Sequence, residues 1–399
     1  MNSNKLLFLI ILLSACLTQF ATDVYIPSIP AIAHALNAPM SAVQHSLAIY
    51  LYGVALTLLI YGPLSDGIGR KIPMAIGLAI MLVGSLVCVG AHSIHTLILG
   101  RFLQGCGAGA CAGLWRSVFR DVFTGDELAK FGSYFTIFVM FIVPGAPVIG
   151  GLLQQYLGWR ASFIFMTGYT LLALVLVIFL YQETSQQHHL DKLKMSAIIH
   201  NFKRLLSSRI FMGITFSTFL TYGAMFSWLS AGPILLIHVV KVTPLVFGLL
   251  TFFAGGIAYA LAGWVNGKLV LRFGMTNMMR LGWTFALIAG ILMLIGKFLF
   301  GINVWAIIIP IILFYFGSTL IWPNAFAGAF TPFGDIAGYA GALYSFMQLG
   351  GGAVIGTVMA YLPAHNQIPL AWVMIICSLL AWFIYEMIPR PVLAPPKNA

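Results

Sequence analysis

The sequence predicts an all-α integral membrane protein with twelve transmembrane helices in two pseudo-symmetric halves of six helices each. Of the 399 residues, 61% are hydrophobic and only 7% are charged, whereas soluble domains carry about 25% charged residues. The mean hydropathy is +0.99, and a spanning helix needs roughly 20 apolar residues. A polar stretch near the middle of the chain separates two hydrophobic blocks of similar length.

Twelve apolar segments follow one another, separated by loops with charged, proline or glycine residues. Pro27 and Pro30 predict a kink in the first segment, because proline removes a hydrogen bond inside a helix. The predicted spans cover residues 6–36, 42–64, 73–91, 94–115, 131–157, 161–180, 210–237, 244–269, 279–300, 304–325, 336–362 and 369–388. We therefore expect an N-terminal half (1–180), a cytoplasmic linker (181–208) and a C-terminal half (209–399).

The basic residues predict the orientation of the chain. With both termini in the cytoplasm, 16 of the 20 Lys and Arg residues fall on the inner side, as the positive-inside rule requires. The net charge of +11 is dispersed among apolar spans, which argues against a nucleic-acid partner. We expect a multi-pass protein of the bacterial inner membrane.

The N-terminus allows a second interpretation. Residues 13–16 resemble a bacterial lipoprotein signal that ends at Cys16. We favour an uncleaved first helix, because the apolar stretch continues past Cys16 and no polar mature domain follows. An intact-mass measurement distinguishes the two. All five cysteines fall in apolar spans without a CxxC pair, which favours helix packing over disulfides or metal binding.

Two loops about 200 residues apart look like copies of one element. Residues 62–71 follow the second predicted span, and residues 266–274 form a degraded version after the eighth. Repeated six-helix halves with a binding site between them are the architecture of many secondary transporters.

Three segments carry a resemblance to a known family. Residues 62–71, 101–108 and 144–151 resemble the helix 2–3, helix 4 and helix 5 motifs of the major facilitator superfamily (MFS). Residues 22–27, 120–121 and 323–338 resemble its Bcr/CflA subfamily of drug–proton antiporters. The helix 5 motif usually has Gly-Pro where this chain has Ala146-Pro147.

The resemblance implies a monomeric, proton-coupled antiporter with the MFS fold that exports antibiotics and other xenobiotics by alternating access. The alternative is a dedicated exporter of a native metabolite, such as a siderophore or an amino-acid derivative. A further alternative is a non-transporting sensor with the same fold. The presence of the transporter motifs argues against it, because such a sensor would not need them. The chain has no HExxH motif, no Walker loop and no nucleophile–base pair, so we expect neither an enzyme nor a cofactor. The expected partners are a small-molecule substrate, protons and the bilayer.

Asp23 is the only one of the nine acidic residues that falls well inside a predicted span. An ionisable side chain at this depth costs several kcal/mol and indicates a function. A carboxyl group that takes up and releases a proton is what proton coupling requires. The alternative is an interfacial residue at a helix end, but Cys16, Gln19 and Asp23 share one helical face, a polar stripe that lipid would reject.

Arg101 is the expected partner of Asp23. Asp23 lies about 27 Å from Lys5 along its helix, and Arg101 lies about 22 Å from Arg116 at the inner end of its own. We hypothesise that Arg101 favours loss of the Asp23 proton in one conformation, and that substrate binding or a conformational change controls its release. The alternative for Arg101 is snorkelling to the outer surface.

The loop motifs have a different predicted role. Asp66, Arg70 and Asp121 are expected to form a charge cluster on the inner face that holds the halves together when the transporter opens outward. The predicted conformational residues are Gly62, Asp66, Gly69, Arg70, Arg120, Asp121, Pro147, Gly150 and Gly151. The alternative is a set of solvated loop charges.

Aromatic and polar side chains at membrane depth are candidates for substrate binding, because aromatic rings suit apolar or cationic drugs. The alternatives are helix packing, an interfacial belt and hydrogen bonds between helices. The predicted cavity residues are Gln19, Tyr25, Gln104, Trp115, Phe138, Tyr222, Phe226, Trp322, Asn324 and Gln348.

Overall fold

The computed structural model describes residues 3–123, 125–184 and 195–388, and every regular element within them is helical. The elements are α1 (Ser3–Asp23), η1 (Ile26–Ser28), α2 (Ile29–Ala35), α3 (Met40–Ile68), α4 (Lys71–Val89), α5 (Ile94–Val122), α6 (Gly125–Leu157), α7 (Arg160–Phe179), α8 (Met195–Leu206), α9 (Arg209–Pro233), η3 (Ile234–Val239), α10 (Pro244–Phe300), α11 (Val304–Phe330), η4 (Thr331–Ile336), α12 (Ala337–Tyr361) and α13 (Ile368–Glu386).

Ten of the described helical segments are long and apolar enough to cross a membrane. One of them, the 57-residue α10, contains two helices that meet at Gly274, whose φ of 77° is not helical. Glycine adopts this conformation without the Cβ penalty of other residues. Dividing α10 there and adding the 33-residue α6 accounts for the twelve predicted spans. The predicted loop 266–274 is helical up to Gly274, so the turn is shorter than expected.

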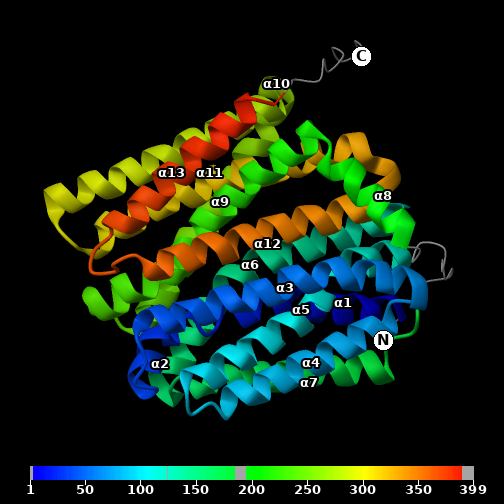
Figure 1. Ribbon diagram of the computed structural model, residues 1–399, viewed down its shortest axis with the longest axis horizontal. Coiled ribbons are helices and arrows are strands. Elements are labelled where there is room, and N and C mark those ends of the chain that lie inside the picture. Colours follow the sequence, from blue (N-terminus) through cyan, green and yellow to red (C-terminus); the bar gives the residue numbers. More distant parts are fainter. Residues whose placement is uncertain (1–2, 124, 185–194, 389–399) are drawn as a thin grey trace.

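The helices run lengthwise between two ends of the molecule (Figure 1). One end carries the start of α1, the helix α8 and the end of α13, and we name it the inner end after the orientation predicted from the sequence. The opposite end, named the outer end, carries α2 and η3. Helices α1–α7 form a first group and α9–α13 a second. The two groups meet where α3 packs on α12 and α6 packs on α10.

Glycines of the predicted helix 4 motif allow α5 to approach its neighbours closely. A Cβ at Gly105 would overlap the carbonyl oxygen of Tyr50 on α3, and one at Gly107 would overlap that of Gly77 on α4. Small residues at such contacts are how helices pack in membranes, where burial from water provides no driving force. The motif therefore fixes the position of α5 and of its side chain Arg101.

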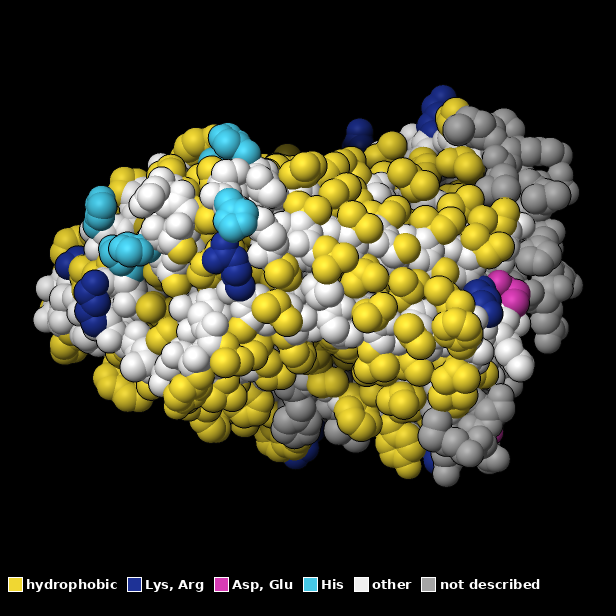
Figure 2. Space-filling view, turned by 90° about the horizontal axis from the view of Figure 1, so that it is seen from below, with side chains coloured by type: hydrophobic (Ala, Val, Ile, Leu, Met, Phe, Trp, Pro, Cys, Tyr) yellow, Lys and Arg dark blue, Asp and Glu magenta, His cyan; other side chains and the backbone are white. Residues whose placement is uncertain are grey.

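Hydrophobic side chains cover most of the visible face between the two ends (Figure 2). His side chains gather at the outer end, and Lys and Arg side chains are visible at both ends. Large apolar residues such as Ile60, Phe253 and Trp372 are more than half exposed. Contact with lipid tails explains this exposure, because a water-soluble surface would not carry such extended apolar area.

Candidate functional site

Asp23 is the last residue of α1 and is only 4% exposed. Its Oδ2 accepts a hydrogen bond of 2.7 Å from the side-chain amide of Gln19, one turn earlier. Its Oδ1 is buried and has no hydrogen-bond partner among the residues that the structure describes. The 3-10 turn η1, formed around Pro27, follows directly and contacts α6, α9 and α10. The carboxyl group therefore lies where both helix groups meet.

Arg101 on α5 is completely buried. Its Nη1 donates hydrogen bonds to the carbonyl oxygen of Ala21, at 2.8 Å, and to the side chain of Gln104. The guanidinium lies 4.4 Å from the ring centre of Tyr25 and 4.3 Å from that of Tyr50. Contact with two aromatic faces stabilises a desolvated cation. Arg101 thus does not snorkel to the outer surface.

The structure brings Arg101 close to Asp23 without an ion pair between them. Arg101 binds the backbone of α1 two residues before Asp23, which agrees with the depths estimated from the sequence. Within the described part of the chain, its Nε and Nη2, like Asp23 Oδ1, are buried without hydrogen-bond partners. The proposed effect of Arg101 on the Asp23 proton stays a prediction.

Replacing Arg101 by lysine is expected to lower both thermal stability and coupled transport. Lysine keeps the charge but loses the planar guanidinium between the two rings, at a cost of about 1–2 kcal/mol for a desolvated cation–π contact. Arg160→Lys is the matched control, because Arg160 also lies over a ring, that of Trp159, and donates to backbone carbonyls. Unaltered coupling in Arg101→Lys would contradict a specific role for the guanidinium.

Tyrosines of the second helix group lie near enough to Asp23 for its charge to act on them. The charge of Asp23 acts on the phenols of Tyr222 (α9), Tyr259 (α10) and Tyr315 (α11). The ring of Trp322 lies 6.5 Å from that of Tyr222 and 6.4 Å from that of Tyr259. Tyr222 and Trp322 were predicted from the sequence. Tyr259 and Tyr315 were not predicted. The one sequence signal for Tyr315 is its i, i+7 spacing from Trp322, which places both residues on one face of a helix.

Two predicted cavity residues connect helices instead. Gln104 is buried, accepts from Arg101 and donates to Ser85 Oγ on α4. Asn324 is buried, donates to Asn266 at 2.7 Å, and lines a cavity of ≈ 290 Å³ within the second group. Both residues thus form hydrogen bonds between helices, which is the alternative to substrate binding that the sequence allowed.

The other predicted cavity residues lie in several places. Tyr25 contacts Arg101, Phe226 is fully buried, and Phe138 is 48% exposed. Gln348 is half-buried on α12. Their roles in substrate binding stay predictions.

A cavity of ≈ 680 Å³ lies at the inner end between the two helix groups. Residues of α3 and α5 form one wall, residues of α11 and α12 form the other, and Phe202 of α8 lies at its edge. Trp115 lines it and stacks on Phe135, with ring centres 4.4 Å apart. The charged residues of the lining are Asp66, Arg70 and Arg116.

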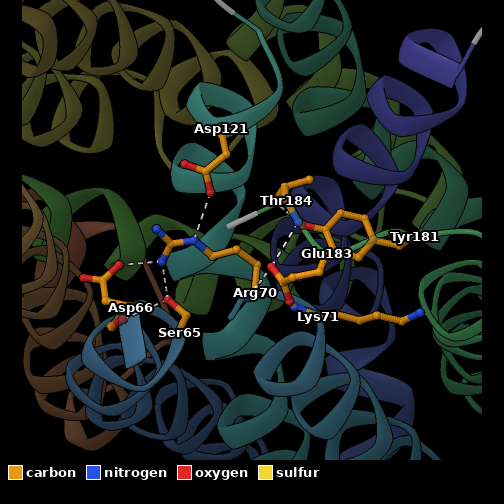
Figure 3. A network of polar contacts seen from close by, with 9 residues as sticks. Ser65, Asp66, Arg70, Lys71, Asp121, Tyr181, Glu183 and Thr184 are labelled. Carbon is orange, nitrogen blue, oxygen red and sulfur yellow. Dashed lines mark hydrogen bonds and ion pairs between the residues drawn. The ribbon is translucent and has the colours of Figure 1, made fainter. Parts of the chain in front are cut away.

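Arg70 forms ion pairs with both Asp66 and Asp121 (Figure 3). The predicted role of this cluster in holding the two halves together stays a prediction. Arg70 Nη1 lies 2.6 Å from Asp66 Oδ1, and Arg70 Nε lies 3.1 Å from Asp121 Oδ2. Burial by itself lowers the pKa of Arg70, but the two carboxylates outweigh it, so this pKa stands above its ordinary value. Gly69, with a φ of 91°, forms the turn before Arg70. Asp66, Arg70 and Asp121 all belong to the first helix group. The side chain of Arg120 lies outside the described residues.

The sequence analysis missed Glu183, which follows α7. Its two carboxylate oxygens accept hydrogen bonds from the backbone N–H groups of Arg70 and Lys71, at 2.9 and 3.0 Å (Figure 3). These groups begin α4, where backbone donors lack partners inside the helix and the helix dipole favours a negative charge. Glu183 therefore caps α4 from more than one hundred residues away and holds the backbone of Arg70.

Replacing Glu183 by glutamine is expected to destabilise the start of α4 by about 1 kcal/mol, the usual loss for a helix cap. The neutral amide has one acceptor oxygen, so it cannot bind both N–H groups equally. The measurement is the midpoint of thermal unfolding in detergent together with the transport rate. Gln182→Ala, at the exposed neighbouring position, is the control, and equal midpoints for both variants would contradict the capping role.

The helix 5 motif closes the outer end. A Cβ at Gly150 would overlap the carbonyl oxygen of Val24, and one at Gly151 would overlap that of Pro244 on α10. Gly248 of α10 approaches the backbone of Pro147 equally closely. The two groups are thus in backbone contact at the outer end, while the large cavity lies at the inner end.

Comparison with known proteins agrees with this architecture. The bicyclomycin resistance protein homolog of Haemophilus influenzae is 28% identical over 388 residues, covering 96% of this chain and 97% of the relative. Multidrug resistance protein D of Escherichia coli is 28% identical over 379 residues, covering 95% and 94%. The solved structure of the xylose transporter XylE from E. coli shares the fold, with a TM-score of 0.71, 98% of each chain covered and 15% identity.

The sequence profile of the Major Facilitator Superfamily matches residues 11–357. This range includes the Asp23–Arg101 region, the charge cluster at the inner end and the glycines at the outer end. The names of the relatives agree with the predicted Bcr/CflA-type resemblance. The chain belongs to the Major Facilitator Superfamily of multi-pass membrane transporters.

Proposed function

We propose that this protein is a proton-coupled antiporter that exports drugs and other xenobiotics across the bacterial inner membrane. The two halves, residues 1–180 and 209–399, alternate between inward-open and outward-open arrangements, and residues 181–208 link them on the cytoplasmic side. The inner end, with both termini, faces the cytoplasm. The names of the relatives, which refer to resistance against bicyclomycin and multiple drugs, support the substrate class.

The observation that carries the proposal is the buried Asp23 carboxyl between the helix groups. One oxygen is bound by Gln19, and the other has no partner among the described residues, so the group can exchange a proton without breaking an ion pair. The tyrosines of α9, α10 and α11, which belong to the other group, lie within reach of its charge. A movement of the groups relative to each other therefore changes the surroundings of the carboxyl, which is how proton binding and conformation become coupled.

The cavity at the inner end suits a drug-sized, largely apolar substrate. Its volume of ≈ 680 Å³ falls in the range of pockets that enclose drug-sized molecules. Aromatic side chains of both groups line it, among them Trp115, Phe119, Phe330 and Tyr339. A substrate from the cytoplasm reaches these rings first, before the region around Asp23.

The test uses inverted membrane vesicles that contain the native chain and hold a pH gradient, acid inside. A panel of antibiotics and native metabolites is added, and the gradient is followed by fluorescence quenching. We expect antibiotics to dissipate the gradient only in vesicles with the protein. Dissipation by metabolites alone would identify a native-metabolite exporter, and a gradient that no compound of the panel affects would contradict the drug-export proposal.

A further inference from the structure

We propose that Gln44 and Ser230 form the latch that keeps the outer end closed, a contact that has to break each time the transporter opens outward. Gln44 lies near the outer end of α3 and is 2% exposed, and Ser230 lies near the outer end of α9 and is 1% exposed. The inference rests on the alternating-access part of the proposed function.

The contact crosses between the two helix groups. Gln44 Nε2 donates to the carbonyl oxygen of Ser230 and to its Oγ, both at 3.1 Å. In the described part of the chain, the other buried side-chain hydrogen bonds that connect α3 or α9 to another element stay within one group. Examples are Tyr25 with Ser46 and Ser217 with Ala381.

The latch and two further contacts between the helix groups together form a seal at the outer end. The next residue on α3, His45, places its ring 4.6 Å from that of Tyr361 on α12. Consecutive residues of α3 thus contact two helices of the second group. The backbone contact of Gly151 with Pro244 lies on the other side of the interface. The seal consists of neutral hydrogen bonds, ring contacts and close backbone packing.

The chemistry of the latch suits a contact that has to open repeatedly. A neutral hydrogen bond in a protein adds little net stability, because water replaces it when the site is exposed. When the outer end opens, water reaches both Gln44 and Ser230 and satisfies their polar groups. An ion pair at the same place would resist the change more strongly, since desolvated charges are costly to separate.

The test measures opening of the outer end in intact cells without any substrate. Ser227 lies three residues before Ser230 on the same face of α9 and is completely buried. A Ser227→Cys reporter reacts with a membrane-impermeant thiol reagent, added outside the cells, only when the outer end opens. The rate for the chain with its native cysteines alone is subtracted.

We expect Gln44→Leu to raise the labelling rate of this reporter about 20-fold, because each lost hydrogen bond shifts the equilibrium about five-fold. Ser230→Ala, which loses only the bond to Oγ, is expected to raise it about five-fold. Ser217→Ala is the matched control, because it removes a buried hydrogen bond of α9 that stays within one group, and we expect no change.

A second reporter separates opening from misfolding. Ser345 lines the inner cavity, and a Ser345→Cys chain is labelled in inverted vesicles. If the latch proposal holds, Gln44→Leu leaves the labelling rate of Ser345→Cys equal or lower. If the substitution loosens the whole fold, labelling of both reporters rises, and this result would overturn the proposal. Unchanged labelling of Ser227→Cys in Gln44→Leu would also overturn it. Since no substrate is used, a shift in labelling supports the latch even if drug export is contradicted.

Discussion

Replacing Asp23 by asparagine is expected to abolish substrate-dependent proton movement while the protein remains folded. The asparagine carbonyl can accept the hydrogen bond that Gln19 donates to Asp23 Oδ2, so the local structure stays. The amide cannot take up or release a proton. Because a buried carboxyl is costly only when ionised, the substitution is expected to maintain or raise thermal stability.

Two assays on the same vesicles separate coupling from substrate movement. Dissipation of the pH gradient by substrate is expected to fall to the level of vesicles without the protein. Exchange of labelled for unlabelled substrate, measured with the gradient collapsed, is expected to continue. Glu127→Gln removes an exposed carboxylate near the inner end of α6 and serves as the control. Full proton movement in Asp23→Asn would show that Asp23 is structural and that the proton site lies elsewhere.

The glycines of the helix 5 motif are expected to give the largest effects on stability. At Gly150, a methyl group would overlap the carbonyl oxygen of Val24 within the first helix group. Backbone cannot move aside as a flexible side chain does, so Gly150→Ala is expected to lower stability by about 1–3 kcal/mol, the usual cost of overpacking. The measurement is the midpoint of thermal unfolding in detergent.

The neighbouring glycine separates stability from conformational change. At Gly151 the obstacle is the carbonyl oxygen of Pro244 on α10, so Gly151→Ala pushes the two groups apart at the outer end. We expect faster labelling of the Ser227→Cys reporter from outside, with a smaller loss of stability than in Gly150→Ala. Gly145→Ala is the matched control, because no atom lies within 4 Å of its added Cβ. Equal behaviour of all three variants would contradict a role for close packing.

The sequence by itself determined the class of the protein and the order of its elements. Hydrophobic runs and charged loops are local properties, so they identified the spans and the loops between them. The motif at residues 62–71 also placed Asp66 and Arg70 in one charge cluster, and the structure shows the ion pair between them. The depth of Arg101 followed from counting residues along straight helices, and the hydrogen bond to Ala21 agrees with it.

Only the tertiary structure decided which side chains meet. In the structure, Arg101 contacts two tyrosine rings and a backbone carbonyl and does not form an ion pair with Asp23. The tertiary structure also brought Glu183 to the start of α4. Such contacts depend on how each helix is rotated and tilted against neighbours that are distant in the sequence. Hydrophobic periodicity fixes the buried face of a helix but not the partner that covers it, so these contacts arise only when all the helices pack together.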